Sequence, residues 1–319
     1  MNYTKFLETV NETLEKILPK GQNIIIRPVP KNNGIVLDGL SIQTDDSHVT
    51  PVVYLNPYYE QYLDGMTIQE ICQDIKSLFE QDLPPFASEE CLEDFESMKS
   101  RVMMKLIHAD SNEKLLLEIP HIPCLDLAIV FYLFLDRNPV GQMTALIHND
   151  LLELWQTTPK KLFCLARQNT PKTYPAEIRS MSDVMKEIAR LHIGKDYSEE
   201  TLNQILDEED DPSPLYVLSN QNGIYGACCI LYQDLLKNFA DSFGSDLIIL
   251  PSSIHEVLLT PDEQGLSYDY LNSMVVQINH SEVPVEDQLS NHIYLYTRKD
   301  DQLHMVSRSD SLSGSSDFN

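Results

Sequence analysis

The longest uninterrupted apolar run in the chain, Leu127 to Leu135, limits the folds that are open to it. Its nine residues are too few to cross a bilayer, but they are enough for a strand buried in a protein interior. A second run rich in apolar residues, Met143 to Ile147, follows shortly and predicts a neighbouring strand. We therefore expect a buried sheet around these residues and no membrane span.

Segments with helical spacing and segments typical of strands alternate irregularly along the chain. Apolar residues recur at helical spacing over 3–18, and β-branched runs at 22–29 and 35–44 flank an Asn-Gly turn. A third strand is expected at 50–55, with helices from there to about residue 100. This order predicts an α+β fold, with an N-terminal helix, a three-strand meander and helices, followed by a larger mixed or antiparallel sheet with helices.

The expected domain organisation has three ranges. Residues 1–100 would form an N-terminal α+β lobe, residues 101–306 a larger α+β domain, and residues 307–319 a disordered tail rich in Ser, Gly and Asp. No stretch of Pro, Gly and Ser separates the lobes near residue 100, so one continuous domain is the alternative. Residues 207–214 have the composition of a linker but lie inside the larger domain.

The charge of the chain is strongly negative and unevenly distributed. Its 49 acidic and 23 basic residues give a formal net charge of -26, which repels phosphate and argues against direct binding to nucleic acid or to an anionic membrane. Residues 57–100 hold eleven acidic and two basic residues, and 196–214 hold eight acidic residues and no base. Residues 160–195 instead form a basic island of eight bases and three acids. Solvated helical faces explain this pattern, and so does an acidic face that binds a basic protein partner.

Other features of the sequence bear on location and cofactors. No apolar signal core opens the chain, so we expect a cytoplasmic protein. Its six cysteines include no C-x-x-C pair and lie beside no histidine cluster, which predicts reduced thiols and no metal site. A Gly-rich phosphate loop and a dinucleotide motif are both absent, so no cofactor is expected. Nothing in the sequence indicates an oligomeric state.

The string most suggestive of chemistry is LPSSIHEV, at residues 250–257. Its Ser253, His255 and Glu256 could form a hydrolase-like site, in which a histidine activates a serine and a carboxylate orients the histidine. Residues so close on one turn seldom reach that geometry. Ser253 and Glu256 also have the spacing of a helix-capping box after a buried strand. A zinc-binding H-E-x-x-H pattern is incomplete because position 259 is Leu259.

A second group, His121, Cys124 and Asp126, precedes the long apolar run. Cys124 could be a nucleophile if His121 stabilised its thiolate, but its position before a buried strand favours packing. We retain His121 as a candidate that could assist the hydrolase-like site at 250–257.

Several strings together resemble a known family. The resemblance rests on segments that occur in this order: LDGL at 37–40, PHIPCLDLAIVFY at 120–132, LIHNDLLELW at 146–155, NTP at 169–171 and LPSSIHEV at 250–257. With these segments the chain resembles an uncharacterised bacterial domain-of-unknown-function family of anaerobic gut Firmicutes, for which LPSSIHEV is the most specific motif. The resemblance implies a bacterial, cytoplasmic protein whose architecture spans nearly the whole chain, and it implies no activity, cofactor or catalytic residue.

Three functions follow as hypotheses. The most favoured is a non-enzymatic cytoplasmic binding or protein-interaction protein that uses an acidic surface. One alternative is a hydrolase-like enzyme that uses Ser253, His255 and Glu256, with His121 as a further candidate. The other alternative is mimicry of a nucleic-acid surface, which requires the carboxylates of 57–100 and 196–214 to lie on one face.

Overall fold

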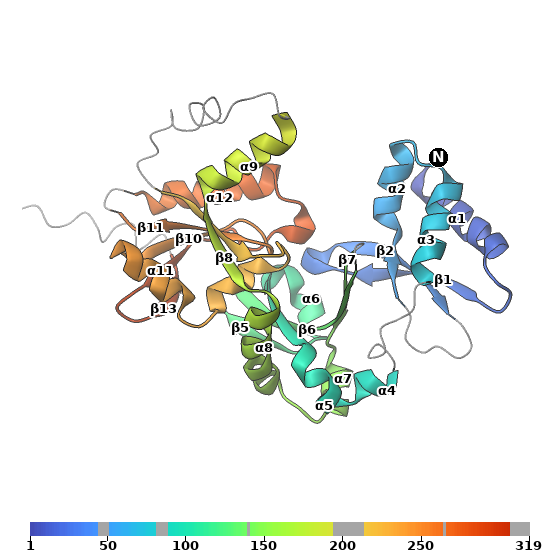
Figure 1. The fold of residues 1–319 in the computed structure, drawn as a ribbon, viewed down its shortest axis with the longest axis horizontal. Coiled ribbons are helices and arrows are strands. Elements are labelled where there is room, and N and C mark those ends of the chain that lie inside the picture. Colours follow the sequence, from blue (N-terminus) through green and yellow to red (C-terminus); the bar gives the residue numbers. More distant parts are fainter. Residues whose placement is uncertain (44–50, 81–88, 139–140, 194–213, 264–265, 307–319) are drawn as a thin grey trace, which may run out of the picture.

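A computed structural model describes residues 1–43, 51–80, 89–138, 141–193, 214–263 and 266–306 of the chain. Helices and antiparallel sheets follow one another irregularly, so the α+β class is confirmed (Figure 1). The disordered tail expected at 307–319 and most of the linker at 207–214 lie outside the described residues.

The N-terminal part, residues 3–79, has a three-stranded antiparallel sheet, three helices and a core of its own. Its strands β1 (Asn23–Pro30), β2 (Val36–Gln43) and β3 (Val53–Tyr54) form the predicted meander. The helices are α1 (Tyr3–Ile17), α2 (Leu55–Leu63) and α3 (Ile68–Phe79). Apolar residues at helical spacing on α1 and α3 close this core, among them Phe6, Val10, Leu14, Ile71, Cys72 and Ile75.

The sequence of this part predicts two helix starts, a capping box at Thr67 and Glu70 and an N-cap at Asn56 before Pro57. The capping box of Thr67 and Glu70 at the start of α3 is confirmed, with both of its reciprocal hydrogen bonds present. The expected N-cap at Asn56 is wrong, because α2 begins one residue earlier, at Leu55. The Asn56 side chain instead accepts a hydrogen bond of 2.8 Å from the backbone N–H of Asp38.

The long apolar run forms the centre of a four-stranded antiparallel sheet. Strand β6 (Leu127–Asn138) pairs with β4 (Val102–His108), β5 (His121–Cys124) and β7 (Gly141–Leu146). The two faces of β6 are both buried. One carries Leu127, Ile129, Phe131, Leu133 and Leu135 into the main core, and the other carries Ala128 and Val130 against α6 (Glu113–Leu116). Burial on both sides explains why the run has no polar alternation.

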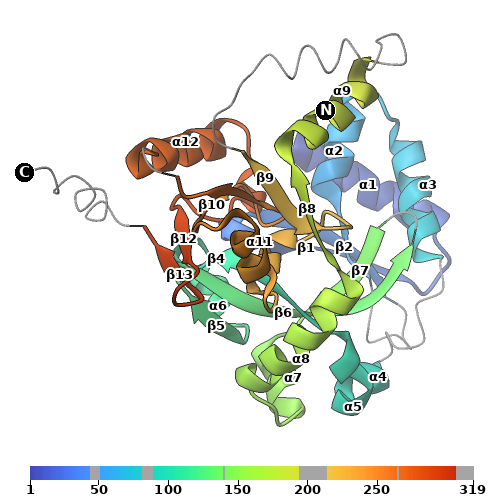
Figure 2. The ribbon, with the colours of Figure 1, turned by 60° about the vertical axis from the view of Figure 1, so that its left-hand side comes forward.

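A six-stranded antiparallel sheet covers the other side of the main core. Its order is β13-β12-β10-β11-β9-β8, and Figure 2 shows β13, β12, β10, β9 and β8 in that sequence. Strand bounds are β8 (Ala176–Ser180), β9 (Tyr216–Asn220), β10 (Leu247–Pro251), β11 (Val257–Pro261), β12 (Tyr294–Thr297) and β13 (Gln302–Met305). In β10, Leu247 and Ile249 join the main core, whereas Ile248 and Leu250 face α12 (Tyr268–Ser281).

The apolar run at 227–232 predicts a strand, and this prediction is wrong. Residues Gly226–Leu231 form a 3-10 helix, η6, which is followed by α11 (Leu235–Phe243). A short apolar run does not by itself distinguish a buried strand from a buried helix. Here Tyr225 has a left-handed backbone with φ of 55°, which turns the chain out of an extended path.

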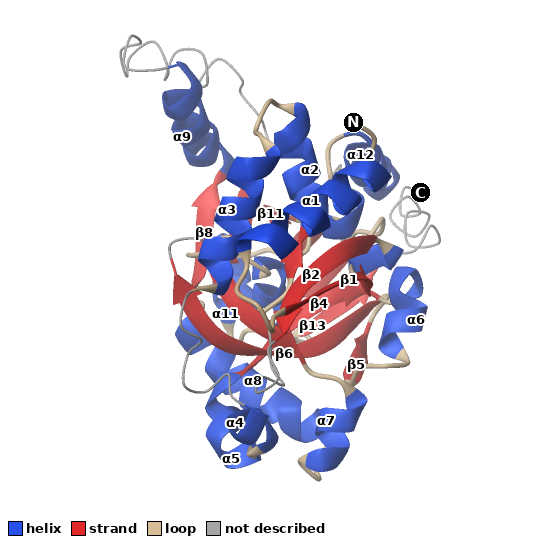
Figure 3. Cartoon of the chain, turned by 90° about the vertical axis from the view of Figure 1, so that its right-hand side faces the viewer, coloured by secondary structure: helices blue, strands red, loops and turns tan. Residues whose placement is uncertain are grey.

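The remaining helices lie outside the main core, and all but the last of them contribute side chains to it. They are α4 (Glu89–Glu93), α5 (Phe95–Met98), α7 (Asn149–Leu154), α8 (Pro159–Thr173) and α9 (Met181–Ile193). Figures 1 and 3 show α4 and α5 beside α7, away from α2 and α3. The acidic segment 57–100 is therefore divided between two places, while residues 194–213 lie outside the described chain. Within the described residues, no helix is long and apolar enough to cross a membrane.

The tip of the β1–β2 hairpin reaches from the N-terminal part to the rest of the protein (Figure 1). This hairpin tip, residues 31–34, contains the 3-10 turn η1 (Asn32–Gly34). The side chain of Asn33 donates to the carbonyls of Val285 and Gln288, each at 2.7 Å, and its backbone N–H donates to Asn112 Oδ1 at 2.8 Å. The hairpin tip is thus held between the end of β4 and the loop before β12. The domain boundary near residue 100 stays a prediction.

Candidate functional site

Residues 250–257 comprise the end of β10, a turn at 252–256 and the first residue of β11, and we call them the 250–257 turn. The Ser253 backbone N–H donates to the Glu256 carbonyl at 3.1 Å, and the Ser253 hydroxyl accepts the His255 N–H at 3.0 Å. The chain then continues as β11, so the capping-box interpretation of Ser253 and Glu256 is wrong: a strand, not a helix, follows the turn.

The ring of His255 is engaged on both nitrogens. Nδ1 accepts the backbone N–H of Tyr225 at 3.2 Å, so the proton resides on Nε2, which lies 3.2 Å from Asp287 Oδ1. The Tyr225 ring stacks on the imidazole with a centroid distance of 5.8 Å. The Ser253 hydroxyl contacts the backbone N–H of His255, and no hydrogen bond within the described chain joins it to the His255 ring. The structure gathers Ser253, His255 and Glu256 in one turn but does not pair them as a hydrolase requires.

The turn is tightly packed against the start of η6. The Ser219 hydroxyl donates to the His255 carbonyl at 2.8 Å, and Ala227 N–H donates to the Ile254 carbonyl at 3.3 Å. Gly226 lies directly beneath, where a Cβ atom would stand 2.5 Å from the His255 carbonyl oxygen. These contacts describe a structural turn.

His121 and Cys124 lie elsewhere, on β5. The His121 ring bonds to the Ile119 carbonyl at 3.2 Å, and no hydrogen bond within the described chain joins it to the 250–257 turn. Burial and the nearby Asp126 carboxylate raise the pKa of the Cys124 thiol, which disfavours a nucleophilic thiolate.

A different carboxylate, Asp126, is the centre of a polar network. It accepts hydrogen bonds from the hydroxyls of Ser290 and Tyr294, each at 2.7 Å, and from His292 Nδ1 at 3.0 Å. Burial alone would raise the pKa of Asp126, but these donors together lower it below its usual range. The network joins the β5–β6 turn to β12.

A serine and a second histidine stand beside this carboxylate. At the end of β4, His108 Nδ1 accepts the Ser111 backbone N–H at 3.3 Å and lies 2.8 Å from the Ser111 hydroxyl. Nε2 then carries the proton and points toward Asp126 Oδ2 at 3.9 Å. A hydroxyl, an imidazole and a carboxylate thus lie in a row, from Ser111 through His108 to Asp126, as in a catalytic triad. The distance from His108 to Asp126 is longer than a hydrogen bond.

A cavity of about 120 Å³ opens beside His108 and Ser111, next to the hairpin tip. We call it the tip cavity, and it is lined by Asn33, His108, Ser111, Asn279, Val285, Gln288, Leu289, Ser290 and Asn291. Asn279 is only 3% exposed, and its Nδ2 donates to the Ser290 carbonyl and to Asn291 Oδ1. Its Oδ1 is buried and accepts no hydrogen bond from any described residue. A buried acceptor without a donor is costly, and this one belongs to a residue that lines the tip cavity.

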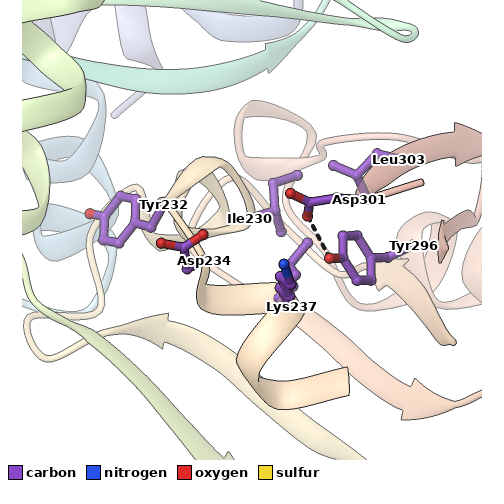
Figure 4. Close-up of a pocket in the computed structure, with 8 residues that line it drawn as sticks. Ile230, Tyr232, Asp234, Lys237, Tyr296, Asp301 and Leu303 are labelled. Carbon is purple, nitrogen blue, oxygen red and sulfur yellow. Dashed lines mark hydrogen bonds between the residues drawn. The ribbon is translucent and has the colours of Figure 1, made fainter. Parts of the chain in front are cut away.

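Figure 4 shows a second cavity, of about 140 Å³, between α11 and the β12–β13 hairpin. It is lined by Ile230, Tyr232, Asp234, Leu236, Lys237, Tyr296, Asp301 and Leu303. The Tyr296 hydroxyl donates to Asp301 at 2.6 Å, and the Tyr232 hydroxyl donates to the Tyr174 carbonyl at 2.9 Å. Both tyrosine hydroxyls are therefore satisfied, and within the described chain no residue of this lining has a buried side-chain N or O atom without a hydrogen bond.

The residues of the tip cavity were not singled out in the sequence. His108 and Ser111 stand three positions apart in HADS, and Ser290 and His292 stand in SNHIY, so each pair carried a weak local signal. No spacing linked these strings to Asp126 or Asn279. In the described part of the chain, no group of three or more His, Cys, Asp or Glu side chains is arranged to hold a metal ion.

Comparison with known proteins gives a family but no function. No curated protein and no solved structure matches the chain. A family of unknown function, DUF5688, matches residues 3–298, which is nearly the whole chain. The protein belongs to this family of unknown function, DUF5688.

Proposed function

We propose that the protein is a binding protein that takes a small polar molecule in the tip cavity. The observation that carries this proposal is the polar lining of the tip cavity, which is drawn from both ends of the chain and includes Asn279, whose buried Oδ1 has no donor among the described residues. A ligand would exchange hydrogen bonds with the polar side chains of this lining, among them His108, which lies close to Asp126.

The size of the tip cavity limits the ligand. Its volume of about 120 Å³ is well below the roughly 300–1,000 Å³ of pockets for drug-sized molecules, and corresponds to about four water molecules. The expected ligand is therefore small and rich in hydrogen-bonding groups, such as an amino acid, a short amide or a small polyol.

A nuclear magnetic resonance titration with a panel of such amino acids, amides and polyols tests the proposal. We expect at least one compound to shift the His108 ring signals and to raise the melting temperature. Ser111→Phe should abolish both effects by filling the mouth of the cavity, whereas Ser77→Phe, at an exposed position on α3, should leave them intact. Binding that survives Ser111→Phe, or a panel that moves no His108 signal, would place the function elsewhere.

A second candidate is a hydrolase in which Ser111, His108 and Asp126 act together, supported by the 2.8 Å contact between Ser111 and His108. The Ser111 hydroxyl would attack an acyl carbon and pass its proton to His108; the bond to the substrate's alcohol or amine would break, and that leaving group would take the proton from His108. Water, deprotonated by His108, would then hydrolyse the Ser111 ester and release the acid. A fluorophosphonate probe distinguishes this site from the one predicted at Ser253, His255 and Glu256 with His121. Labelling lost in Ser111→Ala supports the first site, and labelling lost in Ser253→Ala supports the second.

The acidic surface and a basic protein partner remain proposals, as do a bacterial origin, a cytoplasmic location and nucleic-acid mimicry. Support for a local acidic face comes from α2, α3 and the residues at their C-termini. Together they carry Lys76 as the one base beside five acids, which are Glu60, Asp64, Glu70, Asp74 and Glu80. Binding to a Lys-rich peptide in a salt series tests it. Affinity should fall with salt and with Asp64→Lys and Asp74→Lys, and a salt-independent affinity would refute it.

A further inference from the structure

The hairpin tip carries one of the two Asn-Gly pairs in the sequence, Asn33-Gly34, and the other is Asn222-Gly223. Gly34 is exposed, and a Cβ at this position would meet no atom within 4 Å. Because Gly34 has no Cβ of its own, its backbone nitrogen is sterically open to the side chain of Asn33. An asparagine in this setting can lose its side-chain amide when the backbone nitrogen that follows attacks it.

The Asn33 side chain docks the hairpin tip through both of its polar atoms. Its Nδ2 donates to the carbonyls of Val285 and Gln288, each at 2.7 Å, and its Oδ1 accepts from Asn112 Nδ2 at 2.9 Å. Both protons of Nδ2 are used, so this docking depends on an amide at this position. A carboxylate of the same shape has no proton to donate, and it would place a negative charge against two carbonyl oxygens.

We propose that Asn33 is a site of spontaneous deamidation, and that the product no longer docks the hairpin tip. The Gly34 nitrogen, after losing its proton to a base in the solvent, attacks Asn33 Cγ and forms a cyclic imide. The Cγ–Nδ2 bond breaks, and Nδ2 takes up a proton and leaves as ammonia. Water then opens the imide: hydrolysis at Cγ gives aspartate, and hydrolysis at the backbone carbonyl gives isoaspartate, which has an extra methylene group in the backbone.

The state of the hairpin tip decides when this reaction occurs. In the docked tip, two hydrogen bonds hold Nδ2, so the side chain is not free to turn toward Gly34 and Nδ2 is not free to leave. The reaction therefore proceeds from the undocked tip. Either product then lacks the two donors that docking requires, so deamidation makes a reversible opening permanent. This inference needs no ligand in the tip cavity and is independent of the proposed function.

The second Asn-Gly pair provides a matched control. Its Gly223 N–H donates to the Asn220 carbonyl at 2.9 Å, and Arg137 donates to Asn222 Oδ1 at 3.0 Å. A carboxylate at this position would keep the contact with Arg137 and add charge to it. No hydrogen bond within the described chain joins Asn222 to the hairpin tip. Asn222→Asp thus makes the same change of charge as Asn33→Asp without removing a docking contact.

Hydrogen exchange measured by nuclear magnetic resonance tests the effect on docking. The backbone N–H of residue 33 donates to Asn112 Oδ1 at 2.8 Å. Its protection from exchange should fall about tenfold or more in Asn33→Asp, because two hydrogen bonds of the docked tip are lost. Protection in Asn222→Asp should equal that of the wild-type protein. Unchanged protection in Asn33→Asp, or an equal fall in both variants, would overturn the proposal.

Peptide mapping of the wild-type protein after long incubation tests the reaction itself, and it does not depend on the folding of a variant. In mildly alkaline buffer, the peptide that contains Asn33 should gain aspartate and isoaspartate, and it should do so faster in urea. The deamidated protein, separated by ion exchange, should show the same loss of protection at residue 33. An Asn33 peptide that stays intact while the unfolded protein deamidates there, or a deamidated fraction that keeps full protection, would exclude the proposed site.

Discussion

Gly226→Ala tests whether the 250–257 turn is held by close packing on η6. A Cβ at this position would stand 2.2 Å from Ser219 Oγ, 2.5 Å from the His255 carbonyl oxygen and 2.7 Å from the Asn220 nitrogen. Two of these neighbours are backbone atoms, so no side-chain rotation can relieve the overlap. The turn must therefore move away from η6 by about 1 Å, since ordinary contacts are about 3.5 Å or longer.

The expected cost has two parts. Overpacking a buried position costs about 1–3 kcal/mol, and loss of the hydrogen bond from Ser219 to the His255 carbonyl costs about 1 kcal/mol. Together they predict a loss of about 2–4 kcal/mol in the free energy of unfolding. For a chain of this size that corresponds to a fall of roughly 4–8 °C in melting temperature.

Urea denaturation and the His255 ring signals measure the two consequences separately. Gly223→Ala is the control, because its Cβ would meet no atom within 4 Å and its φ of 64° adds only about 1–2 kcal/mol of left-handed strain. Only Gly226→Ala should also displace the His255 signals. A variant with wild-type stability and unmoved His255 signals would show that the turn does not depend on this close approach.

Three further predictions concern stability. Asp126→Asn should lower the free energy of unfolding by about 2–4 kcal/mol near pH 7. Because the pKa of Asp126 is lower in the folded than in the unfolded protein, the stability of the wild-type protein should fall as pH drops below about 4. Urea denaturation at several pH values should show a weaker fall in the variant. Lys105→Met should stabilise the protein at pH 7 by up to about 3 kcal/mol, because the depressed pKa of Lys105 reflects a charge that folding disfavours. That gain should disappear as pH rises from about 8 toward 10.5, where the wild-type protein alone gains stability, and equal pH profiles would contradict it. Thr67→Ala should remove the capping box of α3 and lower the free energy of unfolding by about 1 kcal/mol in thermal denaturation, with Ser77→Ala as a control of small effect.

Features that depend on neighbouring residues were predictable from the sequence. The period of apolar residues located α1, the Asn-Gly turn located the β1–β2 hairpin, and the run at 127–135 located β6. Each depends on a signal within one element. The strand predicted at 227–232 was wrong because nearly all residues of this run are buried, so their periodicity does not distinguish a strand from a helix. Tertiary contacts select a 3-10 helix there.

The candidate site was less predictable because its members meet only after folding. Ser290 and Asp126 are 164 residues apart, and Asn33 and Val285 are 252 apart, so no local spacing could connect them. The opposite holds for Ser253, His255 and Glu256, whose closeness in sequence predicted a catalytic site although the side chains do not pair in the structure. In the structure the His255 ring is instead bonded to Tyr225 and Asp287, from two other segments.

The hairpin tip gives these separate observations a common physical basis. It contributes Asn33 to the tip cavity, and its Lys31 lies over the Tyr54 ring of β3. The tip is held by hydrogen bonds from both Asn32 and Asn33. The backbone of Asn33 is left-handed, with φ of 55°, a conformation that asparagine adopts more readily than most residues. The tip cavity is therefore complete only while the tip is docked, and ligand binding there would stabilise the docked hairpin by mass action. The N-terminal part would then act as a structural half of this site, even though its core is separate.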